Sequence, residues 1–234
     1  DLHSFPTRRS SDLEPVFRAE ADGLAELSRA RAVRVPDVLA VGEIDGTAFL
    51  VLEWIDLHGA SGGSEAKLGE LLAAQHRVTQ EKFGWYRDNT IGSTPQANRL
   101  TDEWVEFLRE QRLQPQLALA SGNGAGPDLI DSGQRLCERL KYFFAGYQPS
   151  PALLHGDLWG GNWGVAANDQ PVLFDPAVYF GDREADLAMT RLFGGFGASF
   201  YAAYQAAWPL DAGVPARITL YNLYHVLNHF NLRF

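Results

Sequence analysis

Residues 153–162 read L-L-H-G-D-L-W-G-G-N, and residues 171–176 read P-V-L-F-D-P. Asp157 closes the His-Gly-Asp triplet of the first stretch, and Asn162 follows five positions later. Asp175 ends a short apolar run of the kind that forms a buried strand. A Gly-Asp pair alone is common at turns. The ordered set of Asp, Asn and a strand-ending Asp is much rarer, so we interpret these residues as one site.

The order of these side chains suits phosphoryl transfer from ATP. The transferred group needs in-line positioning and charge neutralisation more than covalent help. Asp157 would orient the acceptor hydroxyl and take its proton, while Asn162 and Asp175 would hold Mg²⁺, a hard cation that needs few protein ligands. The protein-kinase catalytic loop has the same Asp-to-Asn spacing before its D-F-G motif. The pattern therefore predicts a kinase that uses ATP and Mg²⁺.

The composition argues against several other classes of protein. The chain has 234 residues, 46% of them hydrophobic, which is enough for one domain or two small lobes. A net charge of −9 argues against nucleic-acid binding. No apolar run approaches the roughly 20 residues of a membrane span, and the single cysteine, Cys137, excludes an internal disulfide framework. Together with the lack of a secretory apolar segment, these features predict a cytoplasmic protein.

The hydrophobic pattern predicts strands early in the chain and helices later. Helical spacing begins at Glu14, extended apolar segments follow at 34–41 and 47–55, and 58–63 is a Gly/Ser loop. Residues 84–98 show no period and are expected to be a long loop, which in a compact domain is usually functional or disordered. Helical patterns occupy most of the remainder, at 64–77, 101–108, 129–144, 182–193, 198–207 and 215–230. This order predicts an α+β fold with two lobes.

These motifs resemble the fructosamine kinase (ketosamine-3-kinase) family, which belongs with the aminoglycoside and choline kinases in the protein-kinase-like fold. The H-G-D-x4-N core and the later aspartate are shared by that superfamily. The W-G-G insert at 159–161 and the D-P-A-x-Y-x-G-D-R-E run at 175–184 are specific to fructosamine kinases. Similar stretches at 83–98 and 107–117 extend the resemblance over nearly the whole chain. It implies a two-lobed kinase-like fold with a mainly helical C-terminal lobe.

The resemblance also implies a division of the chain. Residues 1–13 are polar and aperiodic, and we expect a disordered or foreign leader. Residues 14–57 would form a partial N-terminal lobe, and residues 58–234 a helical C-terminal lobe with the catalytic loop at 155–162. Kinases of this fold use a Gly-rich turn and a lysine to bind phosphates. Because no lysine precedes Lys67 and the leader has no glycine, we expect the N-terminal lobe to be truncated.

The resemblance assigns a role to each candidate residue. Asp157 would be the catalytic base. Glu20 would pair with the lysine that binds the ATP phosphates. Glu53 and Ile55 would belong to the hinge at 53–57, whose backbone binds adenine. Asn162 and Asp175 would be the metal ligands. The acceptor would contact three aromatic side chains: Trp159, Trp85 and His229. The catalytic loop would be supported by two residues, His155 and Asp186. Each assignment has a plainer alternative, since aromatic residues belong to cores by default and acidic residues favour helix starts.

The activity implied by the resemblance is ATP-dependent phosphorylation of the 3-hydroxyl of ketosamines, the fructosamine and ribulosamine adducts of free or protein-bound amines. The product would lose phosphate readily, because C3 lies next to the C2 carbonyl, and deglycation would follow. Three alternatives stay open. A small-molecule kinase of the aminoglycoside or choline kinase type is one, although the W-G-G insert argues against it. The others are a catalytically impaired fragment without the phosphate-binding lysine, and a carboxylate-based hydrolase that passes phosphate to water.

Overall fold

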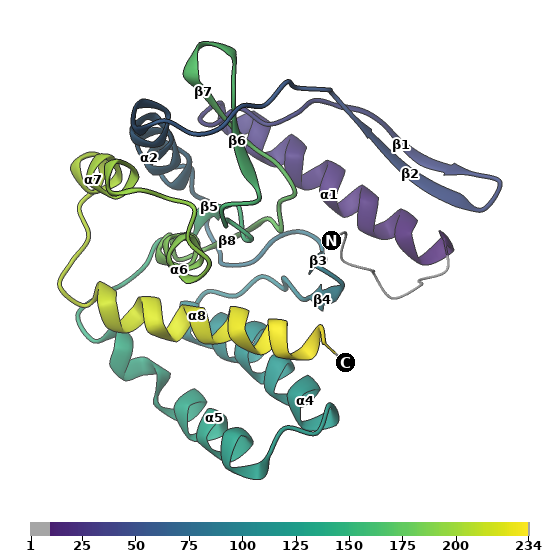
Figure 1. Ribbon diagram of the computed structural model, residues 1–234. Helices are drawn as coiled ribbons and strands as arrows, with labels where there is room; N and C mark the ends of the chain where they lie inside the picture. The colour runs from purple at the N-terminus through teal and green to yellow at the C-terminus, as the bar shows by residue number, and fades with distance from the viewer. Residues whose placement is uncertain (1–9, 234) are drawn as a thin grey trace.

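The structure is a computed structural model that describes residues 10–233 (Figure 1). Its N-terminal part is one helix packed on a strand hairpin: α1 (Ser10–Ala30), β1 (Val38–Ile44) and β2 (Thr47–Leu52). Leu24 and Leu27 of the helix are fully buried. The antiparallel strands turn at Asp45 and Gly46, whose positive φ angles are those of a tight two-residue hairpin turn.

The first helix begins earlier than the sequence predicts. Residues 1–9 of the expected leader lie outside the described residues, whereas residues 10–13 form the first turn of α1. The expected start at Glu14 rested on Pro15, because proline favours the first turn of a helix. Residues 10–13 carry no apolar period that would reveal a helix. The prediction that these four residues are disordered is therefore corrected.

The remainder of the described chain is mainly helical. Its elements, in chain order, are α2 (Gly62–His76), β3 (Asn89–Ile91), β4 (Thr94–Gln96), α3 (Trp104–Leu108), the π-helical turn η1 (Arg109–Leu113), α4 (Gln114–Gly122), α5 (Pro127–Arg139), the 3₁₀ turn η2 (Leu140–Phe144), β5 (Ala152–Leu154), β6 (Trp163–Ala166), the 3₁₀ turn η3 (Ala167–Asp169), β7 (Gln170–Leu173), β8 (Tyr179–Gly181), α6 (Glu184–Leu192), α7 (Ala198–Ala207) and α8 (Val214–Asn231). Early strands and late helices agree with the α+β class expected from the sequence.

Two short strand pairs bring the sequence motifs together. β5 pairs with β8 and β6 pairs with β7, both antiparallel. The loop at 155–162 joins β5 to β6, and residues 174–178 join β7 to β8. These two connections lie side by side, because the Ala177 N–H donates to the carbonyl oxygen of His155 at 2.9 Å. Motifs separated by more than ten residues thus meet at one edge of the strands.

Helix α6 lies at the centre of the helical part, and its residues from Glu184 to Thr190 are all buried. It packs on α8, while α2 and α7 form a close pair beside it (Figure 1). That pair touches at Gly69, where a Cβ atom would lie 2.3 Å from the carbonyl oxygen of Phe200. Because α6 is buried along this stretch, it is a rigid support for the side chains that it positions. Among residues 10–233, no helix has the length and apolarity needed to cross a bilayer.

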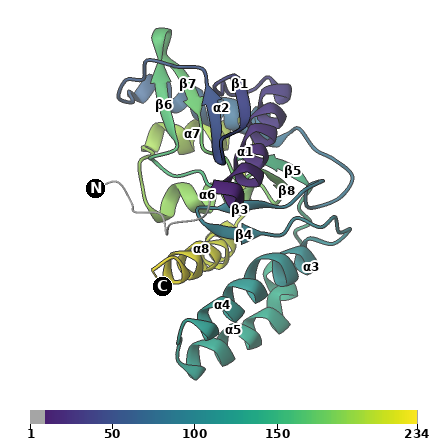
Figure 2. The same ribbon diagram turned by 90° about the vertical axis from the view of Figure 1, so that its right-hand side faces the viewer.

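The segment at 84–98, expected to be an irregular loop, contains the hairpin of β3 and β4. The hairpin lies between α1 and α8 (Figure 2). Each strand has three residues, which is too short for a period of two to be recognised. The end residues of both strands are buried. The expectation of a loop is therefore corrected, although the segment does line the candidate site.

Candidate active site

The catalytic loop starts with a turn that only glycine can make. Gly156 has a φ of +85°, in the left-handed region. A Cβ atom on Gly156 would lie 2.0 Å from the carbonyl oxygen of Ala177. The strand before it is firmly anchored, since Leu153 and Leu154 are fully buried. The His-Gly-Asp triplet therefore has glycine in the middle because the connection after Asp175 passes directly against it.

Asp186 of helix α6 braces this turn. Its two carboxylate oxygens accept the backbone N–H groups of His155, at 2.8 Å, and Gly156, at 2.9 Å. The Nε2 atom of His76 lies 3.1 Å from the same carboxylate, and its Nδ1 bonds to the Tyr204 hydroxyl at 2.8 Å. Burial alone would raise the pKa of Asp186, but the His76 hydrogen bond and the backbone donors lower it. Asp186 is thus an ionised acceptor that ties the loop to the central helix.

His155 is placed to shape the loop rather than to transfer protons. The ring is fully buried, and burial lowers its pKa, so the imidazole is neutral near pH 7. Its Nδ1 accepts the backbone N–H of Asp157 at 3.3 Å, so Nε2 carries the proton and donates to the Phe174 carbonyl oxygen at 3.0 Å. This tautomer links the start of the loop to the residue just before Asp175.

Asn162 joins the two aspartates. Its Nδ2 group donates to the carbonyl oxygens of Asp157, at 2.9 Å, and Asp175, at 3.3 Å. The Oδ1 atom of Asn162 accepts no hydrogen bond from any residue of the described range 10–233, so it can ligate a cation. Asp175 is exposed and has a φ of +56°, a backbone conformation that aspartate tolerates better than most residues. The three residues of the sequence motif thus form one connected group.

Three carboxylates line a single cavity of about 410 Å³: Glu20 from α1, Asp157 and Asp175. Burial and then the charge of Asp175 raise the pKa of Asp157 to about 7. The same two causes raise the pKa of Glu20 to about 7. No lysine or arginine among residues 10–233 lines this cavity, so no basic side chain of that range compensates its negative charge.

These oxygens fit a hard divalent cation. Carboxylates and an asparagine Oδ1 are ligands of Mg²⁺, which keeps several waters or phosphate oxygens of its own. Within the described part of the chain, no three His, Cys, Asp or Glu side chains are close enough to form a complete protein ligand set. A cation here would therefore be shared with a phosphorylated ligand, as the magnesium of kinases is.

The hinge expected at 53–57 follows strand β2 and runs along β6. The Glu53 carboxylate is held by Arg34 at 2.6 Å and by the backbone N–H of Asp37 at 3.2 Å, so this side chain has a structural role. The backbone of Ile55 makes no hydrogen bond to any residue within 10–233. Next to it, His58 pairs with Val165 of β6. An adenine ring could therefore bond to the hinge backbone at Ile55, and the Glu53 carboxylate is not needed for that contact.

The comparison with known proteins decides the family. The family model described as fructosamine kinase matches residues 5–234. The chain belongs to the fructosamine kinase family. Protein-ribulosamine 3-kinase of Arabidopsis thaliana is 42% identical to it, over 99% of this chain and 72% of that protein. A ketoamine kinase homologue of Synechocystis sp. is 45% identical, over 93% of this chain and 73% of that protein.

Solved structures confirm the fold of this fructosamine kinase family member. A fructosamine-3-kinase homologue from Haemophilus somnus 129PT superimposes with a TM-score of 0.87 at 32% identity, covering 97% of this chain and 75% of that chain. An ADP-bound aminoglycoside phosphotransferase gives a TM-score of 0.63 at 13% identity, covering 97% and 77%. At that identity the second likeness shows the fold alone. The α+β, protein-kinase-like fold expected from the sequence is therefore confirmed.

The three aromatic residues expected to bind the acceptor differ in their exposure and in their neighbours. Trp159 is 41% exposed within the loop at 155–162, and its ring lies over Gly161, where a Cβ atom would be 2.3 Å from the ring. His229 is an exposed residue of α8 whose ring packs edge-on against Phe193, with centroids 4.6 Å apart. Trp85 is 3% exposed and does not line the cavity. Neither Trp159 nor His229 lines it either, and Trp85 packs in the hydrophobic core, so the assignment of these residues to the acceptor site stays a prediction.

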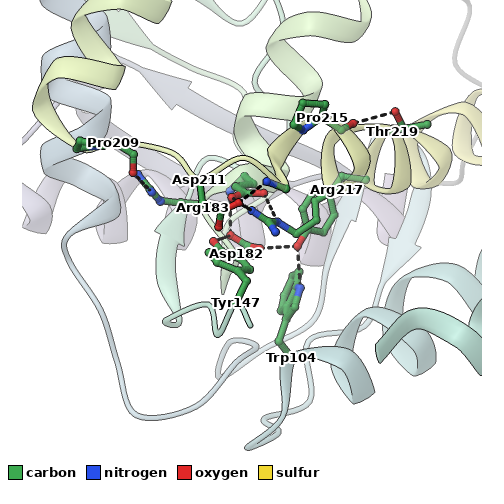
Figure 3. Close-up of polar contacts among 12 residues, drawn as sticks. Trp104, Tyr147, Asp182, Arg183, Pro209, Asp211, Pro215, Arg217 and Thr219 are labelled. Atoms are coloured by element: carbon green, nitrogen blue, oxygen red, sulfur yellow. Dashed lines mark hydrogen bonds and ion pairs between the residues drawn. The ribbon is translucent and has the colours of Figure 1, made fainter. Parts of the chain in front are cut away.

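The sequence did not reveal how the start of α6 is anchored. Asp182 accepts the hydroxyl of Tyr147 at 2.9 Å and that of Tyr221 at 2.5 Å, and it caps the helix at the Glu184 N–H. Glu184 forms a buried bidentate pair with Arg217 of α8. Figure 3 shows Asp182, Tyr147 and Arg217 converging at this point.

The acidic D-R-E run could be explained in the sequence as a helix start, which favours negative charge. Its arginine and tyrosine partners lie more than 30 residues away, so no local pattern predicts them. Burial and then the charge of Glu184 raise the pKa of Asp182 to about 6. The network holds the first turn of α6 in place, and with it Asp186, which braces the catalytic loop.

Proposed function

We propose that this protein is an ATP-dependent kinase that phosphorylates the 3-hydroxyl of ketosamines. The observation that carries the proposal is the braced Asp157, whose carboxylate shares a cavity with Asp175 and has its pKa raised to about 7. Support comes from the family and from relatives named ketoamine kinase and protein-ribulosamine 3-kinase. The W-G-G insert favours this acceptor over an aminoglycoside or an amino alcohol.

In the proposed mechanism Asp157 acts on the acceptor hydroxyl. A base is most effective when its pKa lies near the working pH, and a pKa of about 7 meets that condition. The carboxylate would accept a hydrogen bond from the 3-hydroxyl, aim its oxygen at the transferred phosphorus and take the proton as the bond forms. Because phosphoryl transfer depends mainly on positioning and charge, the fixed loop from Asp157 to Asn162 matters as much as the proton transfer.

The remaining residues bind and orient the nucleotide. Asn162 Oδ1 and the Asp175 carboxylate would hold Mg²⁺, and the backbone at Ile55 would bind adenine. ATP supplies the phosphoryl group, and the metal neutralises the charge on its phosphates. Glu20 has no lysine partner among residues 10–233. Among the described residues, charge neutralisation would therefore rest on the metal.

The instability of the 3-phosphorylated product gives the reaction a use in removing sugars from amines. The C2 carbonyl makes the C1 proton acidic, and the enol formed by its loss can expel the phosphate from C3. Water then hydrolyses the resulting imine between C1 and nitrogen, which releases the amine and leaves a 3-deoxy dicarbonyl sugar. The net result would be deglycation of a free or protein-bound amine. A cytoplasmic location is part of the proposal, supported by the single cysteine and by relatives from bacteria.

The test is a coupled assay of ADP production with Mg²⁺ and ATP in three arms: a fructosyl-lysine derivative, an aminoglycoside and no acceptor. We expect ADP release that depends on the ketosamine and is greatly reduced in Asp157→Asn. Release that depends on the aminoglycoside instead would favour the other kinase class. Equal release without an acceptor would indicate a hydrolase and overturn the proposal.

A further inference from the structure

The β3–β4 hairpin has two different faces. Successive residues of a strand point to opposite sides. Asn89 and Ile91 are buried on one side, together with their cross-strand partners Gln96 and Thr94. Thr90, between them, is only partly buried and lines the cavity that contains the three carboxylates. Asn89 and the turn residues Gly92 and Ser93 also reach this cavity.

The buried face is held by an arginine that has no carboxylate partner. Arg112, in the π-helical turn η1, is 1% exposed, and no acidic side chain among residues 10–233 pairs with it. Its guanidinium lies over the rings of Phe107, at 4.5 Å, and Tyr179, at 4.1 Å. It donates to the Ala97 carbonyl oxygen at 2.6 Å and to Asn98 Oδ1 at 2.7 Å. A buried charge is costly, so its placement at the base of the hairpin needs an explanation.

A chain of side-chain amides continues from Arg112 to the catalytic region. Asn98 and Gln96 both donate to Asn89 Oδ1, at 3.0 and 2.8 Å. Asn89 in turn donates to the Val178 carbonyl oxygen at 2.8 Å, and Gln96 accepts the hydroxyl of Tyr224. Val178 belongs to the connection that follows Asp175. The hairpin is thus fixed relative to Asp175 by hydrogen bonds of defined direction, which an apolar contact would not provide.

The cavity face of the hairpin offers an unused polar group. The Thr90 hydroxyl has no hydrogen-bond partner in the described part of the chain, although its residue lies in a cavity wall. Across the cavity, α1 contributes the apolar side chains of Val16 and Phe17. A ligand here would meet apolar side chains of α1, the carboxylates of the cavity and the hydroxyl-bearing residues Thr90 and Ser93 of the hairpin.

We propose that the β3–β4 hairpin is the polar wall of the acceptor site, that the Thr90 hydroxyl hydrogen-bonds the polyhydroxyl chain of the acceptor, and that Arg112 is a positioning residue that fixes this wall. The inference rests on the proposed function for the identity of the acceptor. It adds a specificity-determining residue and explains why a segment without regular pattern contains so many buried amides.

The test measures binding and turnover separately. Binding uses a 3-deoxy ketosamine, which lacks the reacting hydroxyl, titrated calorimetrically in the presence of Mg²⁺ and a non-hydrolysable ATP analogue. Turnover uses the coupled assay with fructosyl-lysine and gives KM values for acceptor and ATP. The variants are Thr90→Val, which keeps the shape of the side chain, and Arg112→Met, which keeps its length and burial.

We expect Thr90→Val to weaken binding of the 3-deoxy ketosamine and to raise the acceptor KM about three- to tenfold, the effect of one lost hydrogen bond. The KM for ATP should be unchanged. Arg112→Met should raise the acceptor KM further. The matched control is Arg183→Met, since Arg183 is also buried, lies over the Trp208 ring and donates to the carbonyl oxygens of residues 208 and 209. That variant should lose stability without a change in acceptor affinity.

Unchanged acceptor affinity in Thr90→Val would overturn the inference, even if Arg112→Met does not fold. Equal changes in the ATP and acceptor KM values would also contradict it. If the wild-type chain binds the 3-deoxy compound and Thr90→Val weakens that binding, the hairpin inference stands even without phosphoryl transfer. In that case only the proposed function fails. A wild-type chain that neither binds nor turns over the ketosamine contradicts both.

Discussion

At the scale of single residues, the account depends on Asp157 as the base. Its pKa is raised to about 7, first by burial and then by the charges of Asp175 and Asp186. Below pH 7 the carboxyl group becomes protonated and can no longer accept the hydroxyl proton. We therefore expect kcat/KM for the ketosamine to fall about tenfold per pH unit below pH 7 and to level off above it. The measurement is the pH–rate profile from pH 5.5 to 8.5.

The Asp157→Asn variant is the control for this pH–rate profile. The small residual activity of Asp157→Asn should show no such fall, because asparagine does not titrate. A wild-type profile that stays flat from pH 7 down to 5.5 would mean that Asp157 is ionised throughout this range. The pKa shift, and the buried environment assigned to this carboxylate, would then be wrong.

The sequence predicted the identity of the key residues better than their environments. The spacing of Asp157, Asn162 and Asp175 was sufficient to predict that they meet, because a loop and a strand end are short and local. The burial of Trp85 could not be predicted, since nothing in the pattern distinguishes a core tryptophan from one at a ligand site. The pKa shifts of Glu20 and Asp157 depend on residues from distant segments, so no local signal could have revealed them.

At the scale of elements, the close approach of two loops can be tested at Gly156. Gly156→Ala would place a Cβ atom 2.0 Å from the Ala177 carbonyl oxygen, on a backbone with a φ of +85°. We expect a loss of about 2–4 kcal/mol in the free energy of unfolding and a large loss of kcat, because the two connections must separate. Thermal or denaturant unfolding and the coupled assay measure these effects.

Gly124 provides the matched control for that substitution. Its φ of +84° is nearly the same, but no atom lies within 4 Å of the place its Cβ would occupy. Gly124→Ala therefore carries only the backbone strain, about 1 kcal/mol, and should leave kcat unchanged. Equal losses of stability in the two variants would show that the contact between Gly156 and Ala177 is absent.

The long elements were predicted well, and the short ones were not. Helices α6, α7 and α8 carry enough apolar residues at helical spacing for the pattern to show. The three-residue strands β3 and β4 do not. They are held by the buried amides of Asn89 and Gln96, and such contacts come from tertiary structure rather than from local propensity.

At the scale of the whole molecule, uncompensated acidic charge between α1 and the catalytic loop should limit stability. The pKa of Glu20 rises from 4.5 to about 7 on folding, so the folded state binds this proton more tightly than the unfolded state does. The free energy of unfolding therefore decreases as the pH rises from about 4.5 through 7, because the folded state must then lose the proton that it binds more tightly. Stability without Mg²⁺ and nucleotide should fall over this range because of this group.

Glu20→Gln should relieve that cost. We expect the free energy of unfolding to increase by about 2 kcal/mol at pH 8 and by less than half as much at pH 5. Denaturant unfolding at the two pH values, without Mg²⁺ or nucleotide, makes the measurement. Glu70→Gln, on the exposed face of α2, is the control and should change little at either pH. A gain that is larger at pH 5 than at pH 8 would contradict the sign of the Glu20 shift.

Phosphorus NMR of this chain incubated with Mg²⁺, ATP and a fructosyl-lysine derivative tests the central claim most directly, since product accumulates over hours and slow transfer is detected. The account predicts a new phosphomonoester signal coupled to the proton on C3 of the sugar, formed as ATP is lost, and a much weaker signal in Asp157→Asn. A signal of equal strength in Asp157→Asn, conversion of ATP to inorganic phosphate alone, or unchanged ATP in the wild-type sample would contradict it.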